Sequence, residues 1–379
     1  MDSWRSGSAG LTALRWPYFM NQIVEIAQVT AFRTHAKLLN CRSLALHCSP
    51  KDAKTRLMAS LRYLFRSATV SEEREFERDN VARKTEKYLR TNPLDRVRDD
   101  PIYGLKIRHI RDGLQAEGKP IQGLILDIGG NTAGEATVLR QEGYRFVVGD
   151  INELALEISR KRVAKFGLVA PEYVALNALE LPFPENSFSA VTIIEALHHM
   201  PDYDKALAEI YRVLKPGGVL YSHEPNGLNP LRRLSEWRDR MRGTIEKSFF
   251  VSQLQTLCKR AGFREISVRA LAFGVSTWKA QEVPLYRRPV HYLHGYLQAK
   301  LPYFFGPLDI RARKPGRLKD QTPEGDDWKH LLRNPINGKP VTFHGSTGRW
   351  VDTSGEFWFR DSGGIPLLIR SDANPCRSD

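Results

Sequence analysis

Residues 124–134 read LILDIGGNTAG, and the rest of the chain is organised around this stretch. An apolar run, Leu124 to Leu126, leads into a turn dense in small residues, and a helical pattern resumes at 135–139. Strand, glycine turn and helix in this order begin the nucleotide pocket of a doubly wound α/β sheet. Glycine lets a backbone approach a ligand where a Cβ atom would collide. The stretch therefore predicts an α/β fold with a ligand site at this turn.

A second apolar run, residues 146–149, ends in Asp150. This acid lies about 20 residues past the glycines, the spacing at which a carboxylate binds a ribose diol. A dinucleotide site favours G-x-G-x-x-G, but Asn131 occupies the second glycine position here. The spacing predicts an adenosine cofactor and leaves open which one.

Residues 181–218 read LPFPENSFSAVTIIEALHHMPDYDKALAEIYRVLKPGG. Together with LDIGGNTAG and VVGDIN, the blocks ELPFPENSF, EALHHMPD and RVLKPGG resemble the class I S-adenosylmethionine-dependent methyltransferases. The resemblance is in particular to the subgroup that includes ubiquinone and menaquinone biosynthesis enzymes. The resemblance covers about residues 121–315. It implies a methyltransferase with S-adenosyl-L-methionine as cofactor and a Rossmann-like, doubly wound, mostly parallel seven-stranded sheet whose last strand runs antiparallel.

The resemblance also implies the cofactor site. Asp127 would face the ammonium of the methionine moiety, and Asp150 would accept both ribose hydroxyls. Asn177 stands where the family often has an acid near the adenine amino group. Asn131 tolerates positive φ better than most residues, so the turn remains feasible. The residues implied to bind the cofactor are Asp127, Gly129, Gly130, Gly134, Asp150, Ile151, Asn177, Ala178 and Glu195.

Methyl transfer needs alignment more than covalent help, and a base only if the acceptor must lose a proton. The candidates for catalysis follow the fourth and fifth predicted strands: His198, His223 and Glu224. We expect His199 to be a structural residue of the EALHHMPD turn. The four cysteines form no C-x-x-C pair, so no metal site is expected.

Alternating patterns place strands near 123–128, 144–149, 172–177, 189–194 and 218–223, and helices near 134–142, 152–166 and 202–214. A final strand pair is expected near 265–271 and 307–314. The predicted domains are a helical N-terminal extension (1–119), the methyltransferase domain (120–315, with an insertion at about 274–305), a linker (316–327) and a small β-rich unit with a tail (328–379). A helix just before the first strand is expected to cover the cofactor, as the resemblance implies.

The C-terminal unit is similar to the zinc-ribbon-like activator subunit of tRNA, rRNA and release-factor methyltransferases, on its LLRNPINGKP start and GGIPLLI end. Metal-binding relatives have C-P-x-C where residues 334–337 read N-P-I-N. Neutral amides are poor zinc ligands, so we predict a metal-free unit held by its aromatic core.

Charge is uneven along the chain. Residues 121–230 hold 9 Lys and Arg against 14 Asp and Glu, whereas the whole chain carries a net charge of +14. The basic flanks leave nucleic acid or another anionic partner open. The insertion interleaves aromatic and basic residues, so it either packs on the sheet edge or contacts a membrane surface or apolar substrate.

No apolar run approaches the length of a membrane span, and no signal peptide is recognised, so a cytoplasmic location is expected. The predicted reaction is methylation, most simply O-methylation, of a small-molecule, lipid-linked or sugar-linked acceptor. RNA or protein methylation is the first alternative, although no N-P-P-Y-like motif is present. A degenerate binding scaffold is the second, because Asn131 and Asn177 depart from the family pattern.

Overall fold

The computed structural model describes residues 69–116, 118–240, 247–276, 281, 283–318 and 328–376. Predictions for residues 1–68 and for most of the linker at 316–327 lie outside these residues. All described residues belong to the unit Ser67–Asp379.

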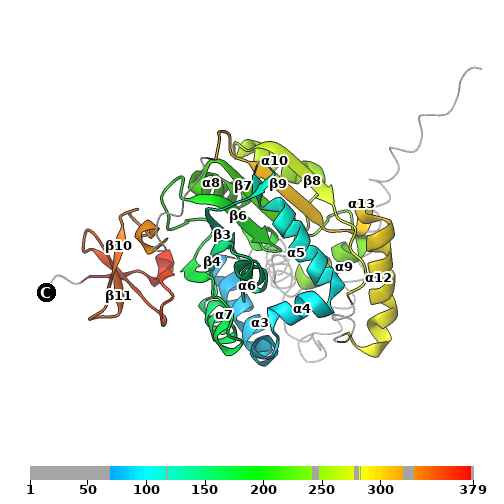
Figure 1. Cartoon of the computed structure of the whole chain (residues 1–379), viewed down its shortest axis with the longest axis horizontal. Helices are drawn as coiled ribbons and strands as arrows, with labels where there is room; N and C mark the ends of the chain where they lie inside the picture. Colours follow the sequence, from blue (N-terminus) through cyan, green and yellow to red (C-terminus); the bar gives the residue numbers. More distant parts are fainter. Residues whose placement is uncertain are drawn as a thin grey trace, which may run out of the picture. The chain divides into compact units, whose positions relative to one another are not determined.

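An eight-stranded sheet forms the centre of this unit (Figure 1), in the order β13-β5-β4-β3-β6-β7-β9-β8. Pairing is parallel from β13 to β7, and β9 runs antiparallel to both β7 and β8. The predicted doubly wound sheet with an antiparallel last strand is thus confirmed. Its strands are β3 (Leu124–Ile128), β4 (Arg145–Asp150), β5 (Glu172–Leu176), β6 (Phe188–Ile194), β7 (Leu214–Glu224), β8 (Arg264–Ala270), β9 (Leu308–Arg313) and β13 (Leu367–Leu368).

Successive strand residues point to opposite faces of the sheet, and each face has its own core. On β3, Leu126 packs in one cluster with Leu207 of α8 (Tyr203–Val213) and Leu254 of α10 (Val251–Arg260). Its neighbour Ile125 packs in the other, with Leu139 of α6 (Gly134–Gln141). Because both faces are covered, the central strands read as continuous apolar runs, as parallel strands do.

The strand order reverses at β3, because β4 and β5 lie on one side of it and β6 and β7 on the other. The chain leaves β3 toward β4 and leaves β6 toward β7, in opposite directions, so no crossing helix closes the carboxyl edge of the sheet between β3 and β6. Open α/β sheets bind their ligands in this crevice. The glycine turn after β3 and Asp150 at the end of β4 both lie there.

Three helices precede the sheet: α3 (Val70–Arg90), α4 (Pro93–Asp99) and α5 (Pro101–Gly113). Each has a side-chain N-cap, and Thr69 and Glu72 form a capping box at the start of α3. Proline opens α4 and α5, where its missing N–H costs nothing. Val81 of α3 packs against Ala155 and Ile158 of α7 (Glu153–Lys165), so α3 lies along α7.

The sheet has one strand more than predicted, and the extra strand comes from the C-terminal unit. Leu367 and Leu368 of β13 pair in parallel with Ala175 and Leu176 of β5. The sequence interpretation assigned GGIPLLI to the small β-rich unit at 328–379. In the structure its two leucines are buried against the main core, and their strand pairs with the backbone groups of the β5 edge.

The rest of the C-terminal unit is a four-stranded antiparallel sheet in the order β10-β11-β12-β14. Its Trp328, Trp350 and Phe359 belong to the same hydrophobic cluster as the main sheet, so the two cores are continuous. The strands are β10 (Val341–His344), β11 (Arg349–Asp352), β12 (Phe357–Arg360) and β14 (Asn374–Pro375).

The N-P-I-N turn is closed by a carboxylate. Asp352 Oδ2 accepts hydrogen bonds from Asn334 Nδ2 (2.9 Å), Asn337 Nδ2 (2.7 Å) and Ser354 Oγ (2.8 Å). Burial opposes ionisation of Asp352, but these hydrogen bonds outweigh it and lower its pKa to about 2. One charged acceptor therefore joins two turns of the unit.

Candidate functional site

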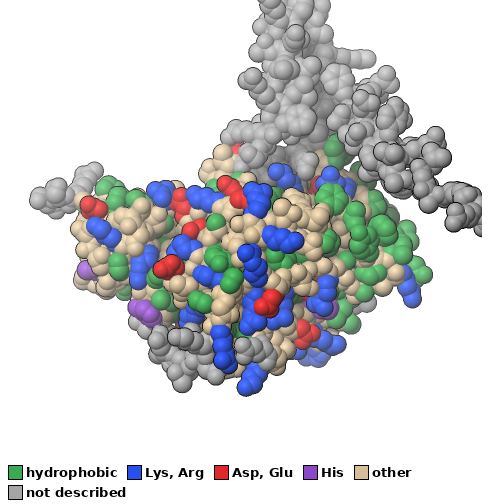
Figure 2. Space-filling view, turned by 90° about the horizontal axis from the view of Figure 1, so that it is seen from above, with side chains coloured by type: hydrophobic (Ala, Val, Ile, Leu, Met, Phe, Trp, Pro, Cys, Tyr) green, Lys and Arg blue, Asp and Glu red, His purple; other side chains and the backbone are tan. Residues whose placement is uncertain are grey.

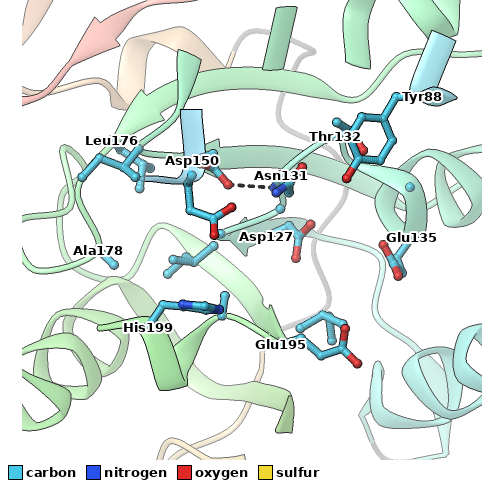
Figure 3. A pocket seen from close by; sticks show the side chains of 18 of the residues that line it. Tyr88, Asp127, Asn131, Thr132, Glu135, Asp150, Leu176, Ala178, Glu195 and His199 are labelled. Atoms are coloured by element: carbon cyan, nitrogen blue, oxygen red, sulfur yellow. Dashed lines mark hydrogen bonds between the residues drawn. The ribbon is translucent and has the colours of Figure 1, made fainter. Parts of the chain in front are cut away.

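A cavity of about 490 Å³ opens at the carboxyl ends of β3, β4, β5 and β6, under the N-terminal helices (Figure 3). All nine residues predicted to bind the cofactor line it. Their roles stay predictions, but they come together from four separate stretches of the chain. The size is typical of a small-ligand site.

Asp150 is held in place by the backbone. Its Oδ2 accepts from the N–H of Asn131 (2.7 Å, dashed in Figure 3), and its Oδ1 accepts from the N–H of Asn152 (2.8 Å). The side chain is 8% exposed, and burial raises its pKa although these hydrogen bonds favour the charged form. Each oxygen keeps a further lone pair, so the carboxylate remains able to accept a pair of hydroxyls.

The turn between the two acids requires unusual backbone angles. Gly129 has φ +70°, and Asn131 has φ 48°, as anticipated for an asparagine replacing glycine. A Cβ atom on Gly130 would lie 2.7 Å from Asp127 Oδ2 and 2.5 Å from a Val148 methyl carbon. Glycine at position 130 therefore lets the main chain pass close to Asp127 and leaves this part of the cavity unfilled.

Asp127 is 5% exposed and accepts a hydrogen bond from Thr192 Oγ1 (2.6 Å). Burial raises its pKa to about 7, and the negative charges of Glu135 and Asp150 act in the same direction. A cation bound beside it would reverse this shift, because an opposite charge favours the ionised carboxylate.

A charge cluster forms the neighbouring wall. Lys106 Nζ lies 3.0 Å from Glu135 Oε1 and 3.5 Å from Glu195 Oε2. Burial lowers the pKa of Lys106, but the two carboxylates outweigh it and the net shift is upward. Glu195, with φ 56°, is a non-glycine residue in the left-handed region. Such backbone strain is concentrated at functional sites.

The N-terminal helices supply the side of the cavity that the sequence interpretation left unassigned. Tyr88 comes from α3, Arg96 from α4, and Tyr103 and Lys106 from α5. The Arg96 guanidinium lies 4.0 Å from the centre of the Tyr103 ring. The sequence predicted only that a helix before the first strand would cover the cofactor. It did not predict these four residues, because they belong to no motif.

The opposite end of the cavity is mostly apolar, with Ile151, Leu176, Ala178 and Leu179. Asn177 lies among them, but its Oδ1 already accepts from the N–H of Leu179 (3.0 Å). The amide therefore stabilises its own turn, and its contact with an adenine stays a prediction.

The three predicted catalytic residues do not line the cavity. Glu224 is fully buried and accepts from the N–H of Leu197 and from His198, whose Nδ1 lies 2.7 Å from Glu224 Oε2. His223 is 1% exposed and stacks on Phe273 at 5.4 Å. Burial lowers its pKa to about 4.

The two adjacent histidines have different surroundings. His199, anticipated as structural, lines the cavity beside Asp150, as Figure 3 shows. His198 instead braces the turn through Glu224. A 3₁₀ turn at Leu197–His199 points consecutive side chains in different directions. The sequence alone did not specify which of the two histidines would face the cavity. Within the described residues, no His, Cys, Asp and Glu cluster suits a metal ion.

Known proteins are similar to the part of the chain that contains most of these residues. Residues 126–222 match the family model of a methyltransferase domain. A ubiquinone/menaquinone biosynthesis C-methyltransferase of Pseudoalteromonas translucida is 42% identical over 100 residues, 25% of this chain and 40% of that protein. The enzyme of the same description from Escherichia coli K12 is 44% identical over 101 residues, with the same shares. The chain therefore spans about 40% of the length of these curated relatives.

Among solved structures, a methyltransferase of Thermotoga maritima, described as a possible histamine N-methyltransferase, is similar with a TM-score of 0.39 and 20% identity. The matched region covers 55% of this chain and 90% of the Thermotoga maritima chain. The match to the family model confirms the prediction of a methyltransferase domain, over residues 126–222.

Proposed function

We propose that this chain, which carries a class I methyltransferase domain, transfers the methyl group of S-adenosylmethionine to a small apolar or lipid-linked acceptor. The observation that carries the proposal is the relation of two acids. Asp127 and Asp150 end adjacent parallel strands, and the glycine turn passes between them into the cavity.

The cavity suits this cofactor in shape and charge. Asp150 has a free lone pair on each oxygen for the two ribose hydroxyls. Asp127 is a buried acid that a cation would ionise, and the cofactor carries an ammonium and a sulfonium. The apolar wall around Ile151 and Ala178 matches the face of an adenine ring. A Cβ atom on Gly130 would intrude on Asp127, so glycine keeps that end open.

When bound, S-adenosylmethionine supplies an activated methyl group, and the chain has to orient it and exclude water. Tyr88 and Tyr103 would cover the cofactor from the side of the N-terminal helices. Holding two reactants in line is the main contribution expected of the protein. Preorganised groups such as Asp150 limit the entropy lost on binding.

A proton must leave the acceptor if an oxygen or a ring carbon is methylated. His199 is our candidate for accepting it, because its side chain lies in the cavity wall and imidazole titrates near neutral pH. Glu195 is the second candidate, with a side chain 53% exposed. This proposal assigns the base to His199 in place of the sequence candidates His198 and His223.

The methylated atom is either an oxygen or a carbon of the acceptor. O-methylation follows from the resemblance noted in the sequence, whereas the two curated relatives are named as C-methyltransferases of quinone biosynthesis. Both reactions suit an apolar ring with an ionisable hydroxyl. Magnetic resonance of the product separates them, because a methyl carbon bonded to oxygen and one bonded to carbon have different chemical shifts.

The first experiment is calorimetric titration of the purified chain with S-adenosylmethionine, with NAD as control ligand. We expect binding of the methyl donor only, and about 1–3 kcal/mol weaker binding for Asp150→Ala, the loss of charge-assisted hydrogen bonds. Asp309→Ala serves as the matched control, since Asp309 is a buried acid outside the cavity. Equal affinity of Asp150→Ala and wild type would exclude this site.

Chains that bind the donor are then screened with radiolabelled methyl donor against phenols and quinols, lipid-linked rings, RNA and protein. Methylation of RNA or protein alone would replace the proposed acceptor class. Absence of donor binding would favour the scaffold alternative.

A further inference from the structure

The segment between β8 and β9 has a large apolar surface that nothing in the described chain covers. It contains α12 (Arg288–Lys300), α13 (Pro302–Phe305) and a short turn, Leu285–Arg287, before them. Nine of the sixteen large hydrophobic side chains that are exposed in the described residues belong to it. We call them the aromatic patch: Leu285, Tyr286, Val290, Tyr292, Leu293, Tyr296, Leu301, Tyr303 and Phe304.

Figure 2 shows hydrophobic side chains gathered at the end of the molecule that carries α12 and α13 in Figure 1. Leu285 and Tyr286 are each 75% exposed. A surface of this extent is unusual for a monomeric soluble protein and marks an interaction site.

The exposure does not come from a loosely placed helix, because α12 is packed by its other face. Gly295 is buried so closely against Val275 that a Cβ atom would lie 2.5 Å from a Val275 methyl carbon. His294 Nε2 lies 3.0 Å from Asn229 Nδ2, and His291 Nε2 lies 3.2 Å from the carbonyl oxygen of Ser276. One face of α12 is therefore packed against the protein, and the exposed side chains lie on the remaining surface of the segment.

The charge around the patch has one sign. Residues 283–308 contain Arg287, Arg288 and Lys300 and no Asp or Glu. The adjoining α9 (Pro230–Arg240) exposes Leu231, Leu234 and Trp237 at helical spacing. Its one acid with a described side chain, Glu236, is buried and lies 2.8 Å from Arg233 Nη1. The surface thus offers apolar rings and cations together, without exposed carboxylates between 283 and 308.

We propose that the aromatic patch docks the protein on the surface of an anionic lipid bilayer. Tyrosine has an apolar ring and a polar tip and partitions to the boundary between hydrocarbon and water. Arg287, Arg288 and Lys300 complement anionic headgroups. Helices of this composition lie in the plane of the interface rather than across it, and no described helix is long and apolar enough to cross a membrane.

A hydrogen-bonded path connects the patch to the cavity. Ser276, whose carbonyl oxygen contacts His291, donates through its hydroxyl to Asp100 Oδ2 at 2.8 Å. Asp100 is the N-cap of α5, the helix that brings Tyr103 and Lys106 to the cavity. Docking would therefore hold the cavity close to a lipid surface. The docking itself requires neither cofactor nor catalysis and is tested without them.

The test is co-sedimentation of the full-length chain with vesicles of phosphatidylcholine, alone or with about one third phosphatidylglycerol. We expect binding to the anionic vesicles that weakens as salt is raised, and little binding to the neutral ones. Arg287→Gln/Arg288→Gln should reduce partitioning roughly 10- to 30-fold. Leu285→Ser/Tyr286→Ser/Tyr303→Ser should reduce it at least as much, because apolar area and charge both contribute.

Two matched variants control for charge and apolarity elsewhere. Lys119→Gln/Arg360→Gln removes two exposed cations outside the patch, and Val169→Ser/Phe343→Ser removes two exposed apolar side chains. Both should bind as wild type. Hydrogen exchange of the wild-type chain should show protection of residues 285–304 on anionic vesicles, which locates the contact without any substitution.

Several results would overturn the proposal. The first is no binding to anionic vesicles, and the second is binding without protection of residues 285–304. A third is a dimer in sedimentation velocity that the serine variant abolishes while vesicle binding is absent, since the patch would then pair two copies of the chain.

Discussion

Arg74 and Asp372, 298 residues apart in the chain, form a two-point ion pair in which Nη1 and Nη2 each lie 3.0 Å from one carboxylate oxygen. Arg74 Nη2 also lies 3.1 Å from Glu153 Oε2. Arg74 belongs to α3, which carries Tyr88 into the cavity, and Asp372 belongs to the C-terminal unit. The far end of the chain therefore fixes a helix that covers the candidate cofactor site.

Removing this pair should loosen α3. We expect Arg74→Met to lower the affinity for S-adenosylmethionine about 3- to 10-fold and the free energy of unfolding by about 1–3 kcal/mol, because two partly buried carboxylates lose a hydrogen-bonded partner. Calorimetric titration and urea unfolding measure the two effects. Arg90→Met is the matched control on the same helix, since its ion pair with Glu86 is largely exposed and worth little. Equal behaviour of both variants would mean that the pair does not support the cavity.

Donor binding should depend on pH through Asp127. Its pKa of about 7 means that the carboxyl is largely protonated below neutrality in the free protein. A bound cation needs the ionised form, so affinity should fall by up to tenfold per pH unit as the pH drops below about 7. Above about pH 8 the α-amino group of the cofactor loses its proton and affinity should decline again.

Calorimetry in buffers of different ionisation enthalpy should detect proton release on binding near pH 6. In Asp127→Asn the acidic limb should disappear and the affinity at pH 7.5 should drop. A flat affinity between about pH 5 and 8 in the wild type would contradict the assignment of Asp127 to the cofactor cation.

The histidines offer a contrast between a cavity residue and a buried one. His199→Gln should lower kcat by about 10²- to 10⁴-fold if the acceptor loses a proton, with cofactor affinity little changed. His223→Gln should leave kcat within a few-fold, because His223 lies outside the cavity and its pKa of about 4 makes it a weak base. Loss of turnover in His223→Gln, with an unchanged unfolding curve, would restore the role expected from the sequence.

The C-terminal unit should depend on Asp352. Its two oxygens accept five hydrogen bonds, three from side chains and two from the N–H groups of Glu356 and Phe357. Asp352→Asn would turn an N–H₂ group toward donors and should cost roughly 2–4 kcal/mol of unfolding free energy, measured by the fluorescence of buried Trp350.

The pH dependence has a defined sign. Because the folded pKa of Asp352 is lowered, its contribution is complete above about pH 5 and is lost as the pH falls toward 2. Glu356→Gln, an exposed neighbour in the same turn, should leave stability within about 0.5 kcal/mol. Equal loss in both variants would point to the turn as a whole rather than to the carboxylate.

The parts of the site that could be predicted from the sequence are local. The glycine turn, Asp127 and Asp150 lie within 27 residues of chain, and their spacing is set by one strand, one helix and the next strand. Five of the nine predicted cofactor residues lie in this stretch, Ile151 follows it directly, and Asn177, Ala178 and Glu195 follow the next two strands of the sheet. The positive φ at Asn131 also followed from the residue type, since asparagine tolerates that region.

The remaining parts depend on which distant elements pack together. Lys106, Arg96 and Tyr88 reach the cavity because three helices fold over the carboxyl edge of the sheet, and their residues carry no motif. His199 rather than His198 faces the cavity, because the His198 ring is hydrogen-bonded to Glu224 at the end of β7. Periodicity reports which residues are buried, but not against what they pack.

The strand–turn–helix order and the acids at the ends of β3 and β4 follow from residue patterns shorter than one βαβ unit, where backbone sterics and apolar spacing leave few alternatives. Pairing of β13 with β5 and the ion pair of Arg74 with Asp372 join residues nearly 200 and 300 positions apart. Such contacts form only when the whole chain has collapsed, since their energy comes from burial and hydrogen bonding between surfaces that no local pattern encodes.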